Sequence, residues 1–249
     1  MQPAFAAARL IGGRLIGGLL ILGLTSSGVL ANDMSDCEGA DIALKIASCS
    51  RLIESHKLPD LKLARIYNHR GMALVMDGKA DRAVDDFSEA ILLDPKFAGA
   101  YNNRGYAYIF MTRFTAALRD FGRAIELQPN DDTAYTGRAT VYILTGRLNA
   151  ALGQLTHALR IDPNDISALM NRAMIRRMMG NILAAMADYR RALKLDPDNE
   201  EIKRNLEDLM NGPGAGGEAS LMPAPGTPKP RLSSTSTSGS HRLSVVWAR

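Results

Sequence analysis

Residues 117–129 read A-L-R-D-F-G-R-A-I-E-L-Q-P, and near-copies of this segment lie on both sides of it. The copies are A-V-D-D-F-S-E-A-I-L-L-D-P at 83–95, A-L-G-Q-L-T-H-A-L-R-I-D-P at 151–163 and A-M-A-D-Y-R-R-A-L-K-L-D-P at 185–197. The closing prolines lie 34 residues apart, at Pro95, Pro129, Pro163 and Pro197. A fixed period of this length predicts a solenoid of stacked supersecondary units.

The period divides the chain into four units, 64–97, 98–131, 132–165 and 166–199. Positions four, eight and eleven of each unit share one face of a first helix, and positions 20, 24 and 27 share one face of a second. Small residues at positions eight, 20 and 27 allow the two helices to approach closely. A turn is expected between them at Gly78, Thr112, Gly146 and Gly180, and proline ends each second helix.

This pattern of large and small residues resembles the tetratricopeptide repeat family over residues 64–199. The resemblance implies an all-α, right-handed solenoid of helix–turn–helix repeats that binds a protein or peptide in a concave groove. In that family the groove is lined by positions two, five, nine, twelve and thirteen of the repeat. The resemblance carries these over to Asn68, Met72, Val75 and Met76; Asn102, Tyr106, Ile109 and Phe110; Thr136, Thr140, Ile143 and Leu144; and Met170, Met174, Arg177 and Met178.

The implied groove is apolar and rich in methionine, which suits adaptable binding of apolar peptide surfaces. The alternative is that part of this set belongs to the hydrophobic core. Members of the family that recognise acidic C-terminal peptides carry basic residues at positions five and thirteen. Those basic residues are absent here, so that kind of recognition is not supported.

Arginine recurs at position seven of every unit, and aspartate recurs at position 23 of all but the third. The arginines are Arg70, Arg104, Arg138 and Arg172. The aspartates are Asp86, Asp120 and Asp188, and the third unit has Gln154 in their place. One interpretation is an arginine–aspartate pair between the two helices of a repeat. The other is a ladder of arginines that binds anions, in which Arg138 would be the arginine best able to reach a ligand.

The N-terminus has the layout of a secretory signal. Arg9 and Arg14 precede a short apolar run, and residues 29–31 read V-L-A. This layout predicts a signal peptide over residues 1–31, cleaved after Ala31, and a mature protein in the bacterial periplasm or outside the cell. The alternative is a retained membrane anchor. The apolar run is shorter than the roughly 20 residues that a spanning helix needs.

The chain has two cysteines, Cys37 and Cys49, and both follow the predicted cleavage site. In an exported chain this pair predicts a disulfide. A redox or metal-binding pair is the alternative, but the spacing is wider than C-x-x-C. We interpret residues 32–63 as an N-terminal cap with a degenerate half repeat. Cys37 is expected in an extended segment, followed by a helix over 41–55 and a linker over 55–63.

Residues 200–211 have apolar residues on one stripe and charges elsewhere, as a C-terminal capping helix should. Residues 212–249 are rich in Gly, Pro, Ser and Thr, which predicts a disordered tail. The alternative for the end of this tail, around Trp247, is a short docking motif that folds on binding.

Catalysis has little support in the sequence. The four histidines, His56, His69, His157 and His241, show no metal-ligand spacing. Neither a phosphate-binding glycine loop nor a nucleophile elbow is present, so we expect no enzyme, cofactor or metal. The net charge of +4 comes largely from the termini, which argues against a nucleic-acid surface.

The expected function is therefore a protein-interaction scaffold or adaptor in the bacterial envelope, which binds a peptide or helix in its groove. Two alternatives remain open. One is a self-associating structural protein. The other is an accessory or regulatory subunit of a cell-envelope enzyme.

Overall fold

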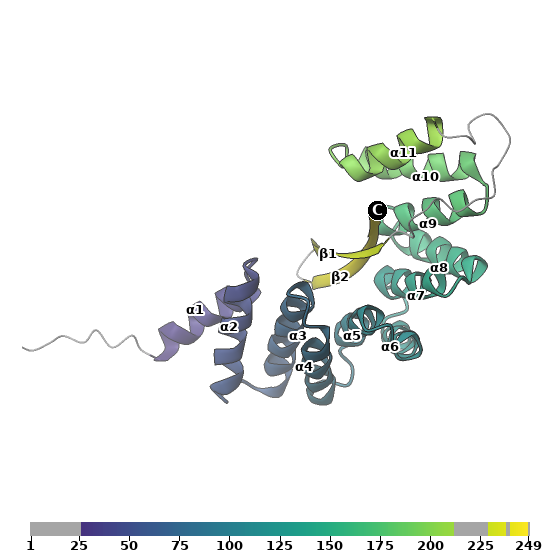
Figure 1. Ribbon diagram of the computed structural model, residues 1–249. Helices are drawn as coiled ribbons and strands as arrows, with labels where there is room; N and C mark the ends of the chain where they lie inside the picture. The colour runs from purple at the N-terminus through teal and green to yellow at the C-terminus, as the bar shows by residue number, and fades with distance from the viewer. Residues whose placement is uncertain (1–25, 212–228, 238–239, 249) are drawn as a thin grey trace, which may run out of the picture.

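The structure is a computed structural model that describes residues 26–211, 229–237 and 240–248. Its helices stack side by side into a curved array (Figure 1). They are α1 (Ser26–Glu38), α2 (Ile42–Glu54), α3 (Asp60–Met76), α4 (Ala80–Leu93), α5 (Ala98–Phe110), α6 (Phe114–Leu127), α7 (Asp132–Leu144), α8 (Leu148–Ile161), α9 (Ile166–Met178), α10 (Ile182–Leu195) and α11 (Glu200–Asn211). The predicted fold class, a stack of helix–turn–helix repeats, is confirmed.

The turn inside each repeat has the backbone conformation that the sequence predicts. Gly78, Gly146 and Gly180 have φ angles of 77°, 72° and 76°, in the left-handed region that favours glycine. Around Gly78, the N–H of Lys79 donates to the carbonyl of Leu74 at 2.8 Å, which closes the helix end. The second repeat makes the same turn with Thr112 at φ 57°, although a β-branched residue adopts this conformation reluctantly.

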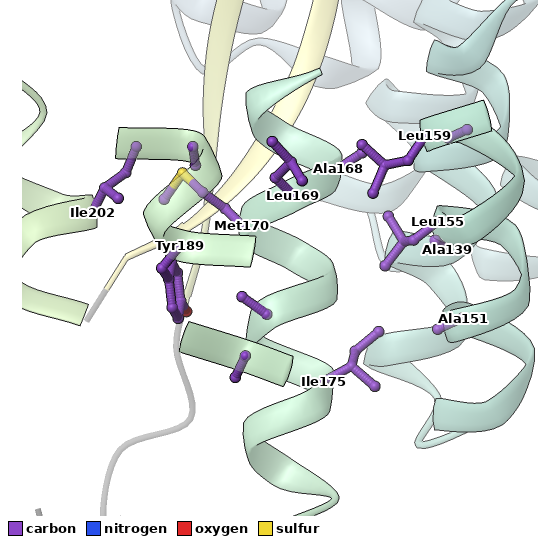
Figure 2. Close-up of a cluster of buried hydrophobic side chains, with 14 of the residues drawn as sticks. Ala139, Ala151, Leu155, Leu159, Ala168, Leu169, Met170, Ile175, Tyr189 and Ile202 are labelled. Atoms are coloured by element: carbon purple, nitrogen blue, oxygen red, sulfur yellow. The ribbon is translucent and has the colours of Figure 1, made fainter. Parts of the chain in front are cut away.

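The core runs through the array as layers between helices, because one helix pair cannot bury its apolar face alone. The largest layer packs around α9. Figure 2 shows Leu155 and Leu159 on one side of this helix, and Tyr189 and Ile202 on the other. These four side chains come from α8, α10 and α11, so each repeat is completed by its neighbour. Helix α11 covers the last layer with Ile202, Leu206 and Leu209.

The N-terminal cap is a helix pair joined by the predicted disulfide, Cys37–Cys49, which is confirmed. The expected extended segment is wrong, because Cys37 lies in α1. The linker is also shorter than expected: Pro59 has an extended conformation, and α3 begins at Asp60, whose charge suits a helix N-terminus. Residues 1–25 of the predicted signal peptide lie outside the described residues. The part of α1 that builds the cap, including Asp33 and Cys37, follows Ala31.

Removing the disulfide should loosen this cap. The bond closes a loop with a sequence separation of 12, for which chain entropy gives a stabilisation of about 2–3 kcal/mol. We expect Cys37→Ala/Cys49→Ala to lose hydrogen-exchange protection in α1 and α2 while α5 to α10 keep theirs. Unchanged protection in α1 and α2 would show that packing alone holds the cap.

The C-terminal segment forms an antiparallel hairpin of β1 (Lys229–Thr237) and β2 (Ser240–Ala248). Its register runs from Lys229 opposite Ala248 to Thr237 opposite Ser240. Strand β2 lies against α5, α7 and α9, inside the curve of the array (Figure 1). The expected disordered tail is therefore wrong for these two segments, while residues 212–228 lie outside the described residues. A two-stranded hairpin is marginal by itself, and the helices supply the surface that it needs.

None of the helices between residues 26 and 211 combines sufficient length with sufficient apolar character to cross a bilayer.

Candidate functional site: the concave face

The concave face is the inner surface of the array, formed by the first helices of the repeats, α3, α5, α7 and α9. These helices contact one another in sequence, α3 with α5, α5 with α7, and α7 with α9. Neighbouring first helices are therefore close together, and Figure 1 shows them on the inner side of the curve. The second helices α4, α6 and α8 lie outside.

Several side chains that the sequence places in the groove belong to the core. Tyr106 is fully buried, and its ring packs edge-on against Phe121 with centroids 5.1 Å apart. Its hydroxyl donates to the carbonyl of Thr133 on the next first helix, at 3.3 Å. Tyr106, at position nine of its repeat, thus packs in the interface with the next repeat. The same interpretation holds for the other apolar members of these buried clusters, Met72, Ile109 and Met170.

Buried polar side chains form a row beside this core. The Asn103 amide donates to Asn68 Oδ1 at 2.9 Å, between the first and second repeats. Thr136 on α7 donates to the carboxylate of Asp165, the N-cap of α9, at 3.2 Å. The Thr140 hydroxyl donates to the carbonyl of Thr136, one turn earlier on the same helix, at 3.0 Å. The bonds of Asn103 and Thr136 fix neighbouring first helices against one another, whereas that of Thr140 stays within α7; each gives a buried polar group the partner that it requires.

Two oxygens in this row lack a partner within the described part of the chain. They are Oδ1 of Asn102 and Oδ1 of Asn103, both on α5. The residues are only 2% and 1% exposed. A buried amide oxygen without a donor is unfavourable, so the face retains hydrogen-bonding capacity that an N–H donor could use.

A second group of predicted residues remains accessible. Phe110, Met174 and Arg177 are partly exposed, and Met76 and Met178 are exposed by 43% and 54%. All five lie on first helices, toward their C-terminal halves. This apolar, methionine-rich strip, with one cation, is the part of the predicted groove that can contact a ligand.

Arg138 does not join this strip. Its counterpart Arg104 makes two hydrogen bonds to Asp120 on α6, at 2.7 and 2.9 Å. Position seven thus faces the second helix of its own repeat, and the repeat period places Arg138 toward α8. Because Gln154 replaces the aspartate there, Arg138 makes no hydrogen bond or ion pair within the described residues.

The arginine–aspartate interpretation is confirmed in the other three repeats. Arg70 pairs with Asp86, Arg104 with Asp120 and Arg172 with Asp188. The aspartates have side chains only 5–7% exposed. These guanidinium groups are therefore engaged between helices, and a continuous anion-binding ladder is not formed.

Three aspartates that the sequence analysis did not select gather where α7 and α9 begin. Asp131 and Asp165 cap these helices by accepting the backbone N–H of Thr133 and of Ala168. Asp132 is the first residue of α7. Burial and repulsion from Asp165 and Asp131 raise the pKa of Asp132 to about 7. Burial likewise raises the pKa of Asp165.

The stability of the array should fall as pH rises between about 4 and 7. The folded chain holds a proton on Asp132 in this range, whereas the unfolded chain, with a pKa of 3.8, has released it. Folding is thus coupled to proton uptake. We expect Asp132→Asn to stabilise the protein more at pH 8 than at pH 5, measured by urea unfolding. The control is Asp85→Asn on the exposed side of α4. An equal effect of Asp132→Asn at both pH values would contradict this assignment.

A metal role for these carboxylates receives no support. Within the described residues, no group of His, Cys, Asp and Glu side chains is arranged to hold a metal ion.

Comparisons with known proteins agree with the repeat geometry. Tetratricopeptide repeat models match residues 64–97, 111–175 and 166–199, and they identify no catalytic domain. No curated protein sequence matches the chain.

Solved structures are similar to this chain in fold. TTC0263, a tetratricopeptide repeat protein of Thermus thermophilus, has a TM-score of 0.62 at 17% identity, over 74% of this chain and 98% of its own. MamA has a TM-score of 0.53 at 20% identity, over 73% and 97%. YrrB has a TM-score of 0.50 at 20% identity, over 67% and 84%. Matched repeat models and stacked helix pairs lead to one conclusion: residues 64–97 and 111–199 of this chain are built of tetratricopeptide repeats.

Proposed function

We propose that this protein is an exported scaffold of the bacterial envelope that binds a protein partner through a peptide segment on its concave face. The observation that carries the proposal is the accessible strip of Phe110, Met174 and Arg177 with the flanking methionines Met76 and Met178. Unbranched methionine side chains adapt to different apolar surfaces. The strip draws on the first helices α3, α5 and α9, and a peptide bound along the array would contact all three.

Two further observations support the proposal. YrrB, which shares this fold, is described as having an unusual peptide-binding site. Export is supported by the signal-like layout of residues 1–31 and by the disulfide Cys37–Cys49, since disulfides persist in oxidising compartments. If the leader is cleaved after Ala31, N-terminal sequencing of protein from the periplasmic fraction will begin at Asn32. A cytosolic protein that begins at Met1 would contradict export.

The groove is tested with a charge placed in the strip. Met174→Glu puts a carboxylate into the partly exposed groove of the fourth repeat, where an apolar ligand surface would be forced to cover it. The matched control is Leu183→Glu on α10 of the same repeat, at a residue 82% exposed on a second helix. We expect a tagged Met174→Glu chain to lose at least tenfold in partner recovered from envelope extract, and Leu183→Glu to match the wild type.

Equal recovery by both variants would remove the concave face from the proposal. Circular dichroism melting of the two variants checks that a lost partner reflects the groove rather than unfolding. A direct titration of the captured partner against the purified chain then replaces the extract.

Self-association is a second candidate, because exposed apolar side chains gather in the last repeat and its cap. They are Met178, Met179, Leu183, Leu195 and Met210. Light scattering over a hundredfold range of concentration tests this idea. A constant monomer mass would exclude it.

A further inference from the structure

The chain places its own C-terminal strand on the face where a partner would bind. Strand β2 contacts α5, α7 and α9, which are the first helices of three consecutive repeats. Strand β1 pairs with β2 along its other edge. Figure 1 shows the hairpin within the curve of the array, across these helices. An extended segment on three successive first helices occupies the surface described above as the concave face.

The covalent connection allows this contact within one molecule. Helix α11 ends at Asn211 and β1 begins at Lys229, so residues 212–228 join the cap to the hairpin. Seventeen residues reach up to about 58 Å when fully extended. A tether of this length holds the hairpin at an effective concentration of the order of millimolar. A segment with only modest affinity therefore occupies the face most of the time.

Charge favours the contact as well. Residues 229–248 include Lys229, Arg231 and Arg242 and contain no acidic residue. The helices beneath β2 carry the carboxylates of Asp132 and Asp165, which repel one another. The composition of the segment is complementary in charge to these acidic helix ends at pH values above the raised pKa of Asp132.

The hairpin does not use everything that the face offers. Asn102 Oδ1 and Asn103 Oδ1 on α5 are buried and remain without a donor within the described structure. A ligand strand that directs an N–H toward these oxygens would gain hydrogen bonds that the hairpin does not make. Such a ligand can displace the hairpin despite the advantage of the tether.

We propose that the hairpin 229–248 is a displaceable intramolecular ligand that covers the concave face over α5, α7 and α9, beside the accessible strip. The ligand class that opens it is an extended, basic peptide segment that adds a strand across α5, α7 and α9. This inference deepens the proposed function and rests on it: the same face binds the partner, and the tail sets how tightly.

The test uses a fluorescein-labelled synthetic peptide of residues 229–248 as the probe. Its binding by anisotropy is compared between the full chain and a chain that ends at Asn211. The shorter chain retains every core cluster, because all their residues lie between Met34 and Leu209. A scrambled peptide of the same composition separates strand recognition from charge alone.

We expect the shorter chain to bind the probe at least tenfold more tightly than the full chain, which corresponds to a face closed in nine of ten molecules. The scrambled peptide should bind at least tenfold more weakly than the probe. Equal binding of the probe to both chains, or no binding to either, would overturn the proposal. So would a full chain that dimerises through its tail and loses the dimer on truncation, because the occupant would then be a second copy.

The partner experiment stays independent of this outcome. If neither chain binds the probe but the full chain still captures an envelope partner through Met174, the inference fails and the proposed function stands. If truncation unmasks probe binding but no variant captures a partner, the tail contact stands and the proposed function fails.

Discussion

Replacing Asp188 with asparagine is expected to destabilise the array by about 3–5 kcal/mol, the usual cost of removing one partner from a buried ion pair. Asp188 accepts hydrogen bonds from Arg172 at 2.7 and 2.9 Å and from Arg176 at 2.6 Å. Its side chain is only 5% exposed. Asparagine leaves both guanidinium groups partly buried without a counter-charge. Urea unfolding followed by circular dichroism measures the loss.

The third repeat supplies the complementary experiment. Gln154 occupies the position of Asp188, and its buried Oε1 has no hydrogen-bond partner within the described residues. Gln154→Asp should stabilise the array by about 1 kcal/mol, because it gives Arg138 a charged acceptor. In a chain that also carries Arg138→Gln, Gln154→Asp should instead destabilise the array. If Asp188→Asn costs less than about 1 kcal/mol, these pairs do not hold the helices together.

Adding one methyl group at Gly137 should cost about 3 kcal/mol, at the upper end of the range for overpacked cores. A Cβ built at Gly137 would lie 2.3 Å from the ring of Phe121, and one built at Gly105 would lie 2.8 Å from it. The ring is thus wedged between glycines of α5 and α7. Because Phe121 is fully buried, it cannot move away from one helix without striking the other.

The matched control is Gly153→Ala in α8. No side chain or backbone atom lies within 4 Å of a Cβ built there. Alanine at this site should stabilise by about 0.5–1 kcal/mol, the difference in helix propensity. Phe121→Leu should recover part of the loss in the Gly137→Ala chain, because the next repeat combines Leu155 with Asn171, the residue at the position equivalent to Gly137. Similar stabilities of the two alanine variants would contradict a tight contact at Gly137.

Much of the fold could be predicted because the same local packing requirements recur in each of the four repeats. The proline period, the turn at Gly78 and the small residues beside Phe121 each follow from the spacing of a few residue types. Position seven and position 23 also predicted the Arg104–Asp120 pair, since both residues recur in step.

The concave face was less predictable. Tyr106 and Phe110 occupy equivalent kinds of position, yet one closes the contact between α5 and α7 and the other is accessible. That difference depends on how closely neighbouring first helices approach, which sequence spacing does not report.

The tail was mispredicted for a similar reason. Its Ser, Thr and Gly content is typical of disorder, and only the β-branched and aromatic run near Trp247 and the Ser-Gly pair at 238–239 favoured a hairpin. The surface that supports the hairpin lies far away in the sequence.

The most decisive measurement is paramagnetic relaxation from a spin label on Ser244→Cys in β2. The two native cysteines are joined in the disulfide, so the label attaches only to the new thiol. If the concave face binds extended segments and the tail occupies it, amide signals of α5, α7 and α9 will broaden while those of the outer faces of α6, α8 and α10 stay sharp. Uniform weak broadening, or broadening confined to the second helices, would contradict this description of the molecule.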